Sequence, residues 1–273
     1  MPDDTIATRR SLGARDPRII RLIAPIIHAF ADRYYRAEVE GAEHLSSHAA
    51  LIVATHNGIW TFPDLVALAS AFWKRFGTQT PGFGLGHRIV FLMPGLGEIA
   101  RRVGGIPASE KNALAALAED RPVLVCPGGD EDAMKPFSQR HRIHFGRRRG
   151  FIRIALLAGV PIIPVVSVGA HETLLVLNEG RRFARWLGLE KAWRVKKVPF
   201  TLSFPFGFTI AGIPSIPLLS KVRVRILPPI DLGLPPEAAS DREAVERCFE
   251  RVRDAMQAAL DELAVGRKRV FFG

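Results

Sequence analysis

Residues 51–64 read Leu-Ile-Val-Ala-Thr-His-Asn-Gly-Ile-Trp-Thr-Phe-Pro-Asp, and the architecture of the chain follows from them. The apolar run at the start predicts a short buried strand, and Gly58 predicts a turn directly after it. We expect a helix to begin near Thr61, which places Asp64 in its first turn. A strand that leads through a glycine turn into a helix is typical of an α/β fold, and here it delivers His56 into the turn.

His56 and Asp64 are the first candidate catalytic residues. Because they lie eight positions apart across a strand-to-helix turn, their side chains can approach closely enough to hydrogen-bond. Such a carboxylate would hold the imidazole in one tautomer and raise its basicity. Two structural interpretations compete with this one. The Thr61-x-x-Asp64 pattern resembles a capping box, in which the carboxylate only accepts backbone N–H groups, and His56 would then simply end a strand.

Composition places the 273-residue chain among globular proteins, because 48% of its residues are hydrophobic and its charged fraction of 24% is ordinary. The net charge of +11 predicts an anionic partner, which can be nucleic acid, a lipid surface or a phosphorylated substrate. Nucleic acid is disfavoured because the basic residues are not interleaved with aromatic residues in a recognisable module. With only Cys126 and Cys248, a disulfide framework or a thiol zinc cluster is excluded.

Strands and helices alternate through the middle of the chain. Residues 122–126 and 160–168 are expected strands, and residues 110–118 and 150–158 are expected helices. Ser109 can cap the first of these helices, and Gly159 ends the second. The alternation predicts an α/β fold in which a mixed, mostly parallel sheet is flanked by helices, with the active-site loops at the strand ends.

The N-terminal part predicts a helix over residues 17–36 that is apolar on one side and flanked by arginines, with Pro25 as a possible kink. A basic amphipathic helix of this kind can lie in a membrane interface or pack on the core. The first four residues carry no basic segment followed by an apolar one, so we expect no signal peptide and a setting in the cytosol or at a membrane face that borders it. We therefore divide the chain into a tail with its helix, 1–45, and a main domain, 46–273, which together form one structural unit.

Residues 198–220 carry no charge, but four prolines and two glycines would break a membrane-spanning helix. We interpret this segment as an apolar loop that either packs on the core or dips into lipid. Residues 77–86 are expected to be a turn-rich connector and residues 222–226 a half-exposed strand. A last amphipathic helix is expected over residues 242–263, capped by Ser240. The basic and apolar tail, 267–272, is a further candidate for lipid contact.

Four sequence blocks, in order, resemble those of the glycerolipid (phospholipid/glycerol) acyltransferase superfamily, and more closely its monoacylglycerol/diacylglycerol acyltransferase-like branch. The resemblance extends from about residue 49 to residue 231. The blocks are His56 to Asp64, Gly104-Gly105-Ile106-Pro107, Val125-Cys126-Pro127-Gly128-Gly129, and Arg149 through Gly159 to Val165.

The resemblance implies acyl transfer from an acyl thioester, either acyl-CoA or an acyl-carrier protein, to a hydroxyl of a lipid acceptor. His56 would act as general base and Asp64 would orient it. Backbone N–H groups near Gly58 or at Gly128 and Gly129 would stabilise the oxyanion. The family chemistry requires neither a metal nor a cofactor. It implies a peripheral enzyme on an anionic membrane surface, at the cytoplasmic face.

The chain departs from the usual family pattern at the His…Asp block and at the third block. Seven residues separate His56 from Asp64 where the usual block has four, so Asp32 or another distant carboxylate stays an alternative partner. Glu131 stands where many relatives carry a phosphate-binding arginine, and a carboxylate there repels phosphate. This favours a neutral hydroxyl acceptor, such as a mono- or diacylglycerol.

The three arginines Arg147, Arg148 and Arg149 have three competing interpretations. They can clamp an acceptor phosphate, bind the phosphates of coenzyme A, or form a solvated basic loop. Two other functions also stay open for the whole chain. One is a catalytically silent lipid-binding protein of this fold. The other is a serine hydrolase, which the absence of a Gly-x-Ser-x-Gly elbow disfavours.

Overall fold

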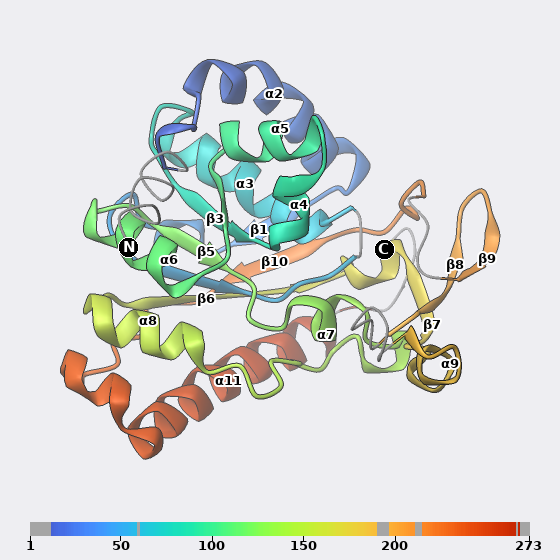
Figure 1. Cartoon of the computed structure of the whole chain (residues 1–273). Helices are drawn as coiled ribbons and strands as arrows, with labels where there is room; N and C mark the ends of the chain where they lie inside the picture. Colours follow the sequence, from blue (N-terminus) through green and yellow to red (C-terminus); the bar gives the residue numbers. More distant parts are fainter. Residues whose placement is uncertain (1–11, 59–60, 190–196, 211–214, 266, 268–273) are drawn as a thin grey trace.

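The computed structural model describes residues 12–58, 61–189, 197–210, 215–265 and 267 (Figure 1). Its main element is a seven-stranded sheet in the order β1-β10-β6-β2-β5-β3-β4. The five strands from β6 to β4 are parallel, and β10 runs antiparallel to β6. The strands are β1 (Glu38–Glu40), β2 (Leu51–Ala54), β3 (Phe83–Gly86), β4 (Gly105–Pro107), β5 (Val123–Val125), β6 (Ile162–Val168) and β10 (Arg223–Ile226). The predicted mixed, mostly parallel α/β sheet is confirmed.

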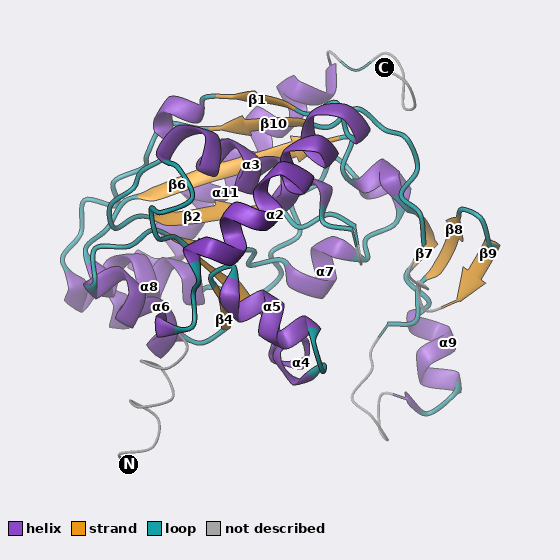
Figure 2. Ribbon diagram, turned by 90° about the horizontal axis from the view of Figure 1, so that it is seen from above, coloured by secondary structure: helices purple, strands orange, loops and turns teal. Residues whose placement is uncertain are grey.

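Helices cover both faces of this sheet (Figures 1 and 2). On one face α3 (Pro63–Phe76) packs on the strands and is backed by α2 (Pro17–Ala29), with α4 (Arg88–Leu92) and α5 (Leu96–Arg102) nearby. On the other face lie α6 (Glu110–Ala118), α8 (Gly150–Ala158) and α11 (Arg242–Val265). The larger apolar core lies under α8 and α11 and the smaller one under α3, so strands β2 and β6 are buried on both sides.

Short elements complete the described chain. They are the π-helix Phe30–Tyr34, the short helix α7 (Gly129–Ala133), α9 (Arg181–Trp186), and 3₁₀ turns at Ala42–His44, Phe137–Gln139, His171–Thr173 and Pro236–Ser240. Strand β1 belongs to the N-terminal part and pairs with β10, which ties the tail segment into the main sheet. Within the described residues, no helix is both long enough and apolar enough to span a bilayer.

Several local predictions are confirmed. Helices α6 and α8 have the expected bounds; the Ser109 side chain caps α6, and Gly159 ends α8 in the left-handed conformation. One helix start and one helix cap differ from the prediction, while α11 itself begins at Arg242 as expected. Helix α3 begins at Pro63 and has Phe62 as its N-cap. Proline favours this first helical position because its fixed φ suits the helix and the N–H that it lacks would have no partner there. At α11, Asp241 accepts the Glu243 N–H in place of the predicted Ser240 cap.

Two predicted loops contain strands. Residues 77–86 include β3, which pairs with both β4 and β5. Residues 198–220 form a hairpin of β8 (Phe200–Ser203) and β9 (Gly207–Ile210), which joins β7 (Leu175–Asn178) in a second, antiparallel sheet. The loop prediction was wrong because it relied on the prolines and glycines of the segment. Within 200–210, Pro205 lies in the turn between the strands and Gly207 begins β9. The prediction for residues 267–272 falls almost entirely outside the described residues.

Candidate active site

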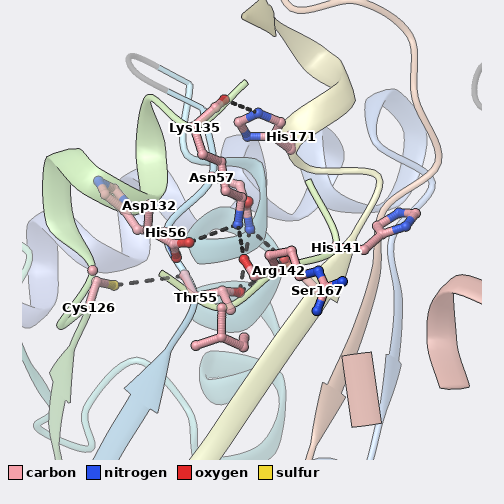
Figure 3. Close-up of polar contacts among 12 residues, drawn as sticks. Thr55, His56, Asn57, Cys126, Asp132, Lys135, His141, Arg142, Ser167 and His171 are labelled. Carbon is pink, nitrogen blue, oxygen red and sulfur yellow. Dashed lines mark hydrogen bonds and ion pairs between the residues drawn. The ribbon is translucent and has the colours of Figure 1, made fainter. Parts of the chain in front are cut away.

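The candidate site lies where strands β2, β5 and β6 end. Parallel pairing sets Val53 beside Val125 and Pro164, so all three strands deliver their following residues to one edge of the sheet. His56 follows β2, the Pro127-Gly128-Gly129 turn follows β5, and Ser167 lies at the end of β6 (Figure 3). The carboxyl edge of a parallel sheet is where α/β proteins place their ligand sites.

His56 is held by its backbone and by an aromatic ring. Its backbone N–H donates to Oδ2 of Asp132 at 2.7 Å. Its imidazole stacks on the Phe62 ring with a centroid distance of 5.1 Å and an interplanar angle of 10°. The Nδ1 atom is buried and forms no hydrogen bond with any of the described residues. Burial lowers the pKa of His56, against the opposing effect of the Asp132 charge, so the ring is neutral at pH 7.

Asp132 itself forms a buried ion pair with Lys135. The Lys135 Nζ atom lies 2.7 Å from Oδ1 of Asp132, and both side chains are inaccessible to solvent. Nζ also donates to the Arg142 carbonyl at 3.0 Å, and the Lys135 carbonyl lies 2.8 Å from Nε2 of His171 (Figure 3). Burial lowers the pKa of His171 to about 3, so this imidazole is neutral and donates from Nε2. Since every charge in the group is satisfied, the group fixes α7 against the His56 turn.

Asp64 contacts the residue after His56 rather than His56 itself. Its Oδ2 accepts the Asn57 backbone N–H at 3.1 Å and the Asn57 side-chain amide at 3.0 Å, while Oδ1 accepts the Leu65 N–H. The Asn57 amide also donates to Ser167 at 3.0 Å. The predicted hydrogen bond between His56 and Asp64 is therefore not formed in this structure. Burial raises the pKa of Asp64 to about 7.

The structure also shows where Asp32, the alternative partner of His56, lies and which residue is the N-cap of α3. Asp32 pairs with Lys74 at 2.7 Å on the surface and serves no site residue. Thr61 is not the N-cap of α3, since that position belongs to Phe62, whose backbone is left-handed at φ 40°. A non-glycine residue in that conformation stores strain, and here it directs the Phe62 ring onto His56.

The three predicted glycines are each required by the backbone or by close contacts. Gly58 has φ +74°, which favours glycine. A Cβ on Gly128 would lie 2.3 Å from the Cβ of Asp132 and 2.7 Å from the His144 carbonyl. Gly129 has φ +47° and donates its N–H to the Cys126 carbonyl at 3.1 Å, which removes that N–H from the candidate oxyanion donors.

Two of the three predicted arginines are engaged within the protein. Arg148 donates to the Pro127 and Gly128 carbonyls at 3.0 and 2.7 Å and pairs with Asp130. Arg149 forms a bidentate pair with Glu246 at 2.7 and 2.8 Å, and its guanidinium lies 3.4 Å from the centroid of the Phe249 ring. Arg147 is exposed on the surface.

Glu131 lies in α7 and pairs with two cations, Arg181 at the start of α9 and Lys197 just before β8. Its Oε2 lies 2.6 Å from Arg181 and 2.7 Å from Lys197, whose side chain is only 2% exposed. Glu179 completes the cluster by pairing with both cations. None of the arginines at 147–149 pairs with Glu131 among the described contacts.

Sequence reasoning missed the residues that hold His56 in place, namely Asn57, Phe62, Asp132 and Lys135. Asn57 gave a local signal, because an amide that directly follows a buried strand needs polar partners. The spacing of Asp132 and Lys135, i and i+3, also fits one side of a helical turn. Nothing in the sequence connects Asp132 to a histidine 76 residues earlier.

Comparison with known proteins relates the chain to acyltransferases. The Acyltransferase family model matches residues 36–168. An uncharacterized protein of Mycobacterium tuberculosis is 31% identical over 256 residues, which cover 92% of this chain and 68% of that protein. The "DGAT1/2-independent enzyme synthesizing storage lipids" of Mus musculus is 24% identical over 242 residues, covering 89% of this chain and 65% of that enzyme.

A solved structure matches the fold across nearly the whole chain. The crystal structure of the 1-acyl-sn-glycerophosphate (LPA) acyltransferase, PlsC, from Thermotoga maritima superposes with a TM-score of 0.55 at 18% identity, covering 97% of this chain and 90% of that chain. The fold is therefore that of an α/β acyltransferase. The chain belongs to the glycerolipid acyltransferase family, as the sequence blocks predicted. Family and fold together support lipid acyl transfer.

Proposed function

We propose that the protein transfers a fatty acyl group from an acyl thioester to the hydroxyl of a glycerolipid or another lipid acceptor, with His56 as general base. The observation that carries this proposal is the state of His56. Its ring is oriented by Phe62, its Nδ1 has no partner among the described residues, and its lowered pKa keeps it neutral at pH 7. A neutral imidazole at the carboxyl edge of the sheet can accept a proton from a bound hydroxyl.

The proposed step is a direct transfer. The imidazole takes the proton of the acceptor hydroxyl while that oxygen attacks the thioester carbonyl carbon. The C–S bond then breaks, and the imidazolium returns the proton to the departing thiolate. The products are an ester and a free thiol, and no cofactor or metal takes part because acyl-CoA or the acyl-carrier protein is a co-substrate. The charge of Asp132, which lies against the His56 backbone, would stabilise the imidazolium as it forms.

The roles proposed for the other predicted residues follow from their contacts. Asp64 would support His56 through Asn57, to which its carboxylate is bonded. Gly58 and Gly128 keep the proposed task of presenting backbone N–H groups to the oxyanion. Arg147 is exposed and stays a candidate for the phosphates of coenzyme A.

The acceptor we propose presents a neutral hydroxyl, as a mono- or diacylglycerol does. Glu131 places a carboxylate next to the Pro-Gly-Gly turn, and its two cations also bind Glu179, so the local charges are balanced. Arg148 and Arg149 are engaged by Asp130 and Glu246. A phosphate would therefore have to displace existing ion pairs.

We also propose that the protein works as a peripheral protein at the cytoplasmic face of a membrane, on an anionic lipid surface. The support is the net charge of +11 together with several large apolar side chains that are exposed on the described surface. A lipid acceptor that stays in its bilayer also requires the enzyme to come to it.

Acyl transfer from radiolabelled acyl-CoA to a panel of monoacylglycerol, diacylglycerol and lysophosphatidic acid tests the proposal. A second arm supplies acyl-carrier protein as donor, and His56→Ala is the control. Transfer that the His56 variant abolishes supports the assignment. Lipid binding without any transfer would favour the silent lipid-binding alternative. Release of free fatty acid alone would favour the hydrolase.

A further inference from the structure

The hairpin β8–β9 has its polar and apolar faces reversed relative to an ordinary surface sheet. Thr201, Ser203 and Thr209 point inward and are buried, with the Thr201 and Thr209 hydroxyls 2.7 Å apart. The outward positions alternate with them and are occupied by apolar side chains. Antiparallel sheets at a protein surface usually turn their apolar face to the core and their polar face to water. The outward face of this hairpin is therefore suited to contact with an apolar environment.

The outward side chains are large and strongly exposed. Phe204, Phe206 and Phe208 are 58%, 57% and 60% exposed, and the neighbouring outward residues are Leu202 and Ile210. The hairpin projects from one end of the molecule, away from the seven-stranded sheet (Figures 1 and 2). Exposed apolar surface of this extent marks an interaction site, since single scattered residues would be the norm.

Helix α9 extends the same surface through a row of aromatic contacts. The Phe200 ring lies 5.9 Å from Phe208 and 5.4 Å from Phe183, and Phe183 lies 6.0 Å from Trp186. Trp186 is 78% exposed. The exposed cations Arg182 and Arg185 stand on this helix. We call the hairpin and α9, residues 181–186 and 200–210, the aromatic wing.

Ion pairs link the aromatic wing to the candidate active site, one from Arg181 within the wing and one from Lys197, which lies just before β8. Arg181 and Lys197 both bind Glu131 in α7, and the next residue, Asp132, holds the backbone of His56. The nearly buried Lys197 bridges Glu131 and Glu179 at 2.7 and 2.9 Å. Through these contacts, the wing would hold the His56 turn at a fixed distance from the surface that the wing binds.

We propose that the aromatic wing is the element that docks the protein on a lipid bilayer, with Phe204, Phe206 and Phe208 inserted among the acyl chains. Residues 198–220 contain no charge that would be buried by insertion. Trp186, Arg182 and Arg185 have the chemistry of the headgroup region, where an indole and arginines meet anionic lipids. Because the occupant is a bilayer that also holds the acceptor, the inference rests on the proposed function.

Vesicle binding tests the wing without using the reaction. Vesicles of phosphatidylcholine and phosphatidylglycerol are co-sedimented with the full chain, with a triple variant Phe204→Ser/Phe206→Ser/Phe208→Ser, and with a matched triple variant Leu157→Ser/Leu234→Ser/Val265→Ser. The matched residues are also exposed and apolar but lie on other elements. We expect the wing variant to lose about tenfold or more of its partition coefficient and the matched variant to keep it.

A third variant, Arg182→Gln/Arg185→Gln, separates charge from insertion. It should weaken binding at low salt only, because high salt already screens these charges. A fluorophore that reports on polarity, attached at Phe206→Cys, should shift to the blue on vesicles, whereas the same probe at Val265→Cys should not. Because Cys126 and Cys248 can also react with the fluorophore, the signal of the labelled parent chain is subtracted from that of each variant.

Equal vesicle binding of the wing variant and the parent, or a probe at position 206 that stays in water, would overturn the proposal. A parent chain that sediments as a dimer together with a wing variant that sediments as a monomer would also overturn it, since the wing would then bind a second copy. None of these measurements depends on acyl transfer. Normal vesicle docking without turnover would refute the proposed reaction alone, and turnover on dispersed acceptor without docking would refute the wing alone.

Discussion

Asp132 accepts the backbone N–H of His56 at 2.7 Å, across 76 residues of sequence. The carboxylate that acts on His56 in this structure therefore comes from helix α7, and Asp64, eight residues after the histidine, bonds to Asn57 instead. Asp132 acts on the ring through its charge, which raises the pKa of His56 against the lowering by burial.

Neutralising Asp132 should therefore shift the pH profile of the enzyme. In Asp132→Asn the pKa of His56 falls further, so the acidic limb of kcat/KM moves to lower pH. The plateau value should drop by about tenfold or more, because a nearby carboxylate no longer stabilises the imidazolium. Steady-state kinetics from pH 4 to 9 with matched protein concentrations measure both effects.

Lys135 complicates that variant and supplies its control. Asp132→Asn alone leaves the buried Lys135 ammonium without its partner, which costs about 3–5 kcal/mol in unfolding free energy. The double variant Asp132→Asn/Lys135→Met removes both charges and should regain much of that stability while keeping the low plateau. A double variant with full turnover would show that the charge of Asp132 plays no part in the reaction.

Removing the His56 imidazole should abolish transfer without unfolding the protein. The ring stacks on Phe62 and makes no hydrogen bond to another side chain among the described residues, so His56→Ala removes little packing. We expect turnover to fall by about 10²–10⁴-fold with the melting temperature nearly unchanged. Circular dichroism and the radiolabelled transfer assay on the same preparation check both. Turnover of the variant near the parent level would show that a residue other than His56 is the general base.

Asp64 should make stability depend on pH in a recognisable direction. Its pKa is raised from 3.8 to about 7 by burial, so between these values the folded state binds a proton that the unfolded state has lost. Stability contributed by this group is therefore full below about pH 4 and declines as the pH rises toward 7. In Asp64→Asn that decline should disappear, and urea unfolding at a series of pH values measures it.

The same Asp64 variant tests the dyad hypothesis. An amide at this position keeps only one acceptor oxygen, so it can accept either the Asn57 N–H or the Leu65 N–H but not both. Turnover is therefore expressed per folded molecule. If Asp64 supports catalysis through Asn57, turnover per folded molecule falls well below the parent value. Unchanged turnover together with a flattened pH dependence of stability would leave Asp64 a structural role only.

Local sequence signals predicted much of the fold. Ser109 and Gly159 identified the ends of helices α6 and α8, because capping and the left-handed conformation depend on single residues. The hairpin β8–β9 was missed because the prolines and glycines of residues 198–220 were taken to indicate a loop, although residues 200–203 alternate between apolar and polar as a strand does. The site was predicted only in part. His56 follows from its strand and turn, whereas Asp132 and Lys197 act through tertiary contacts that no local pattern encodes.

Arg149 should prove a structural residue with no influence on the choice of acceptor. It links α8 to α11 by its bidentate pair with Glu246 and by stacking on Phe249, so Arg149→Ala should lower the melting temperature by about a few degrees. Competition between monoacylglycerol and lysophosphatidic acid, at matched surface concentration, should favour monoacylglycerol in both the parent and the variant. The expected ratio is the same because the guanidinium is already occupied by a carboxylate.

Glu246→Gln and Arg147→Ala are the controls for this experiment. Glu246→Gln weakens the same helix contact but keeps the stacking of Arg149 on Phe249 and leaves the guanidinium available to a phosphate. It should therefore lower the melting temperature less than Arg149→Ala and match the parent in acceptor preference. Arg147 is exposed, and its removal should change neither stability nor the acceptor ratio. A preference for lysophosphatidic acid that Arg149→Ala abolishes and Glu246→Gln strengthens would show that Arg149 exchanges its carboxylate for a substrate phosphate. In that case the acceptor would be phosphorylated, and the balanced charges around Glu131 would have no bearing on acceptor choice.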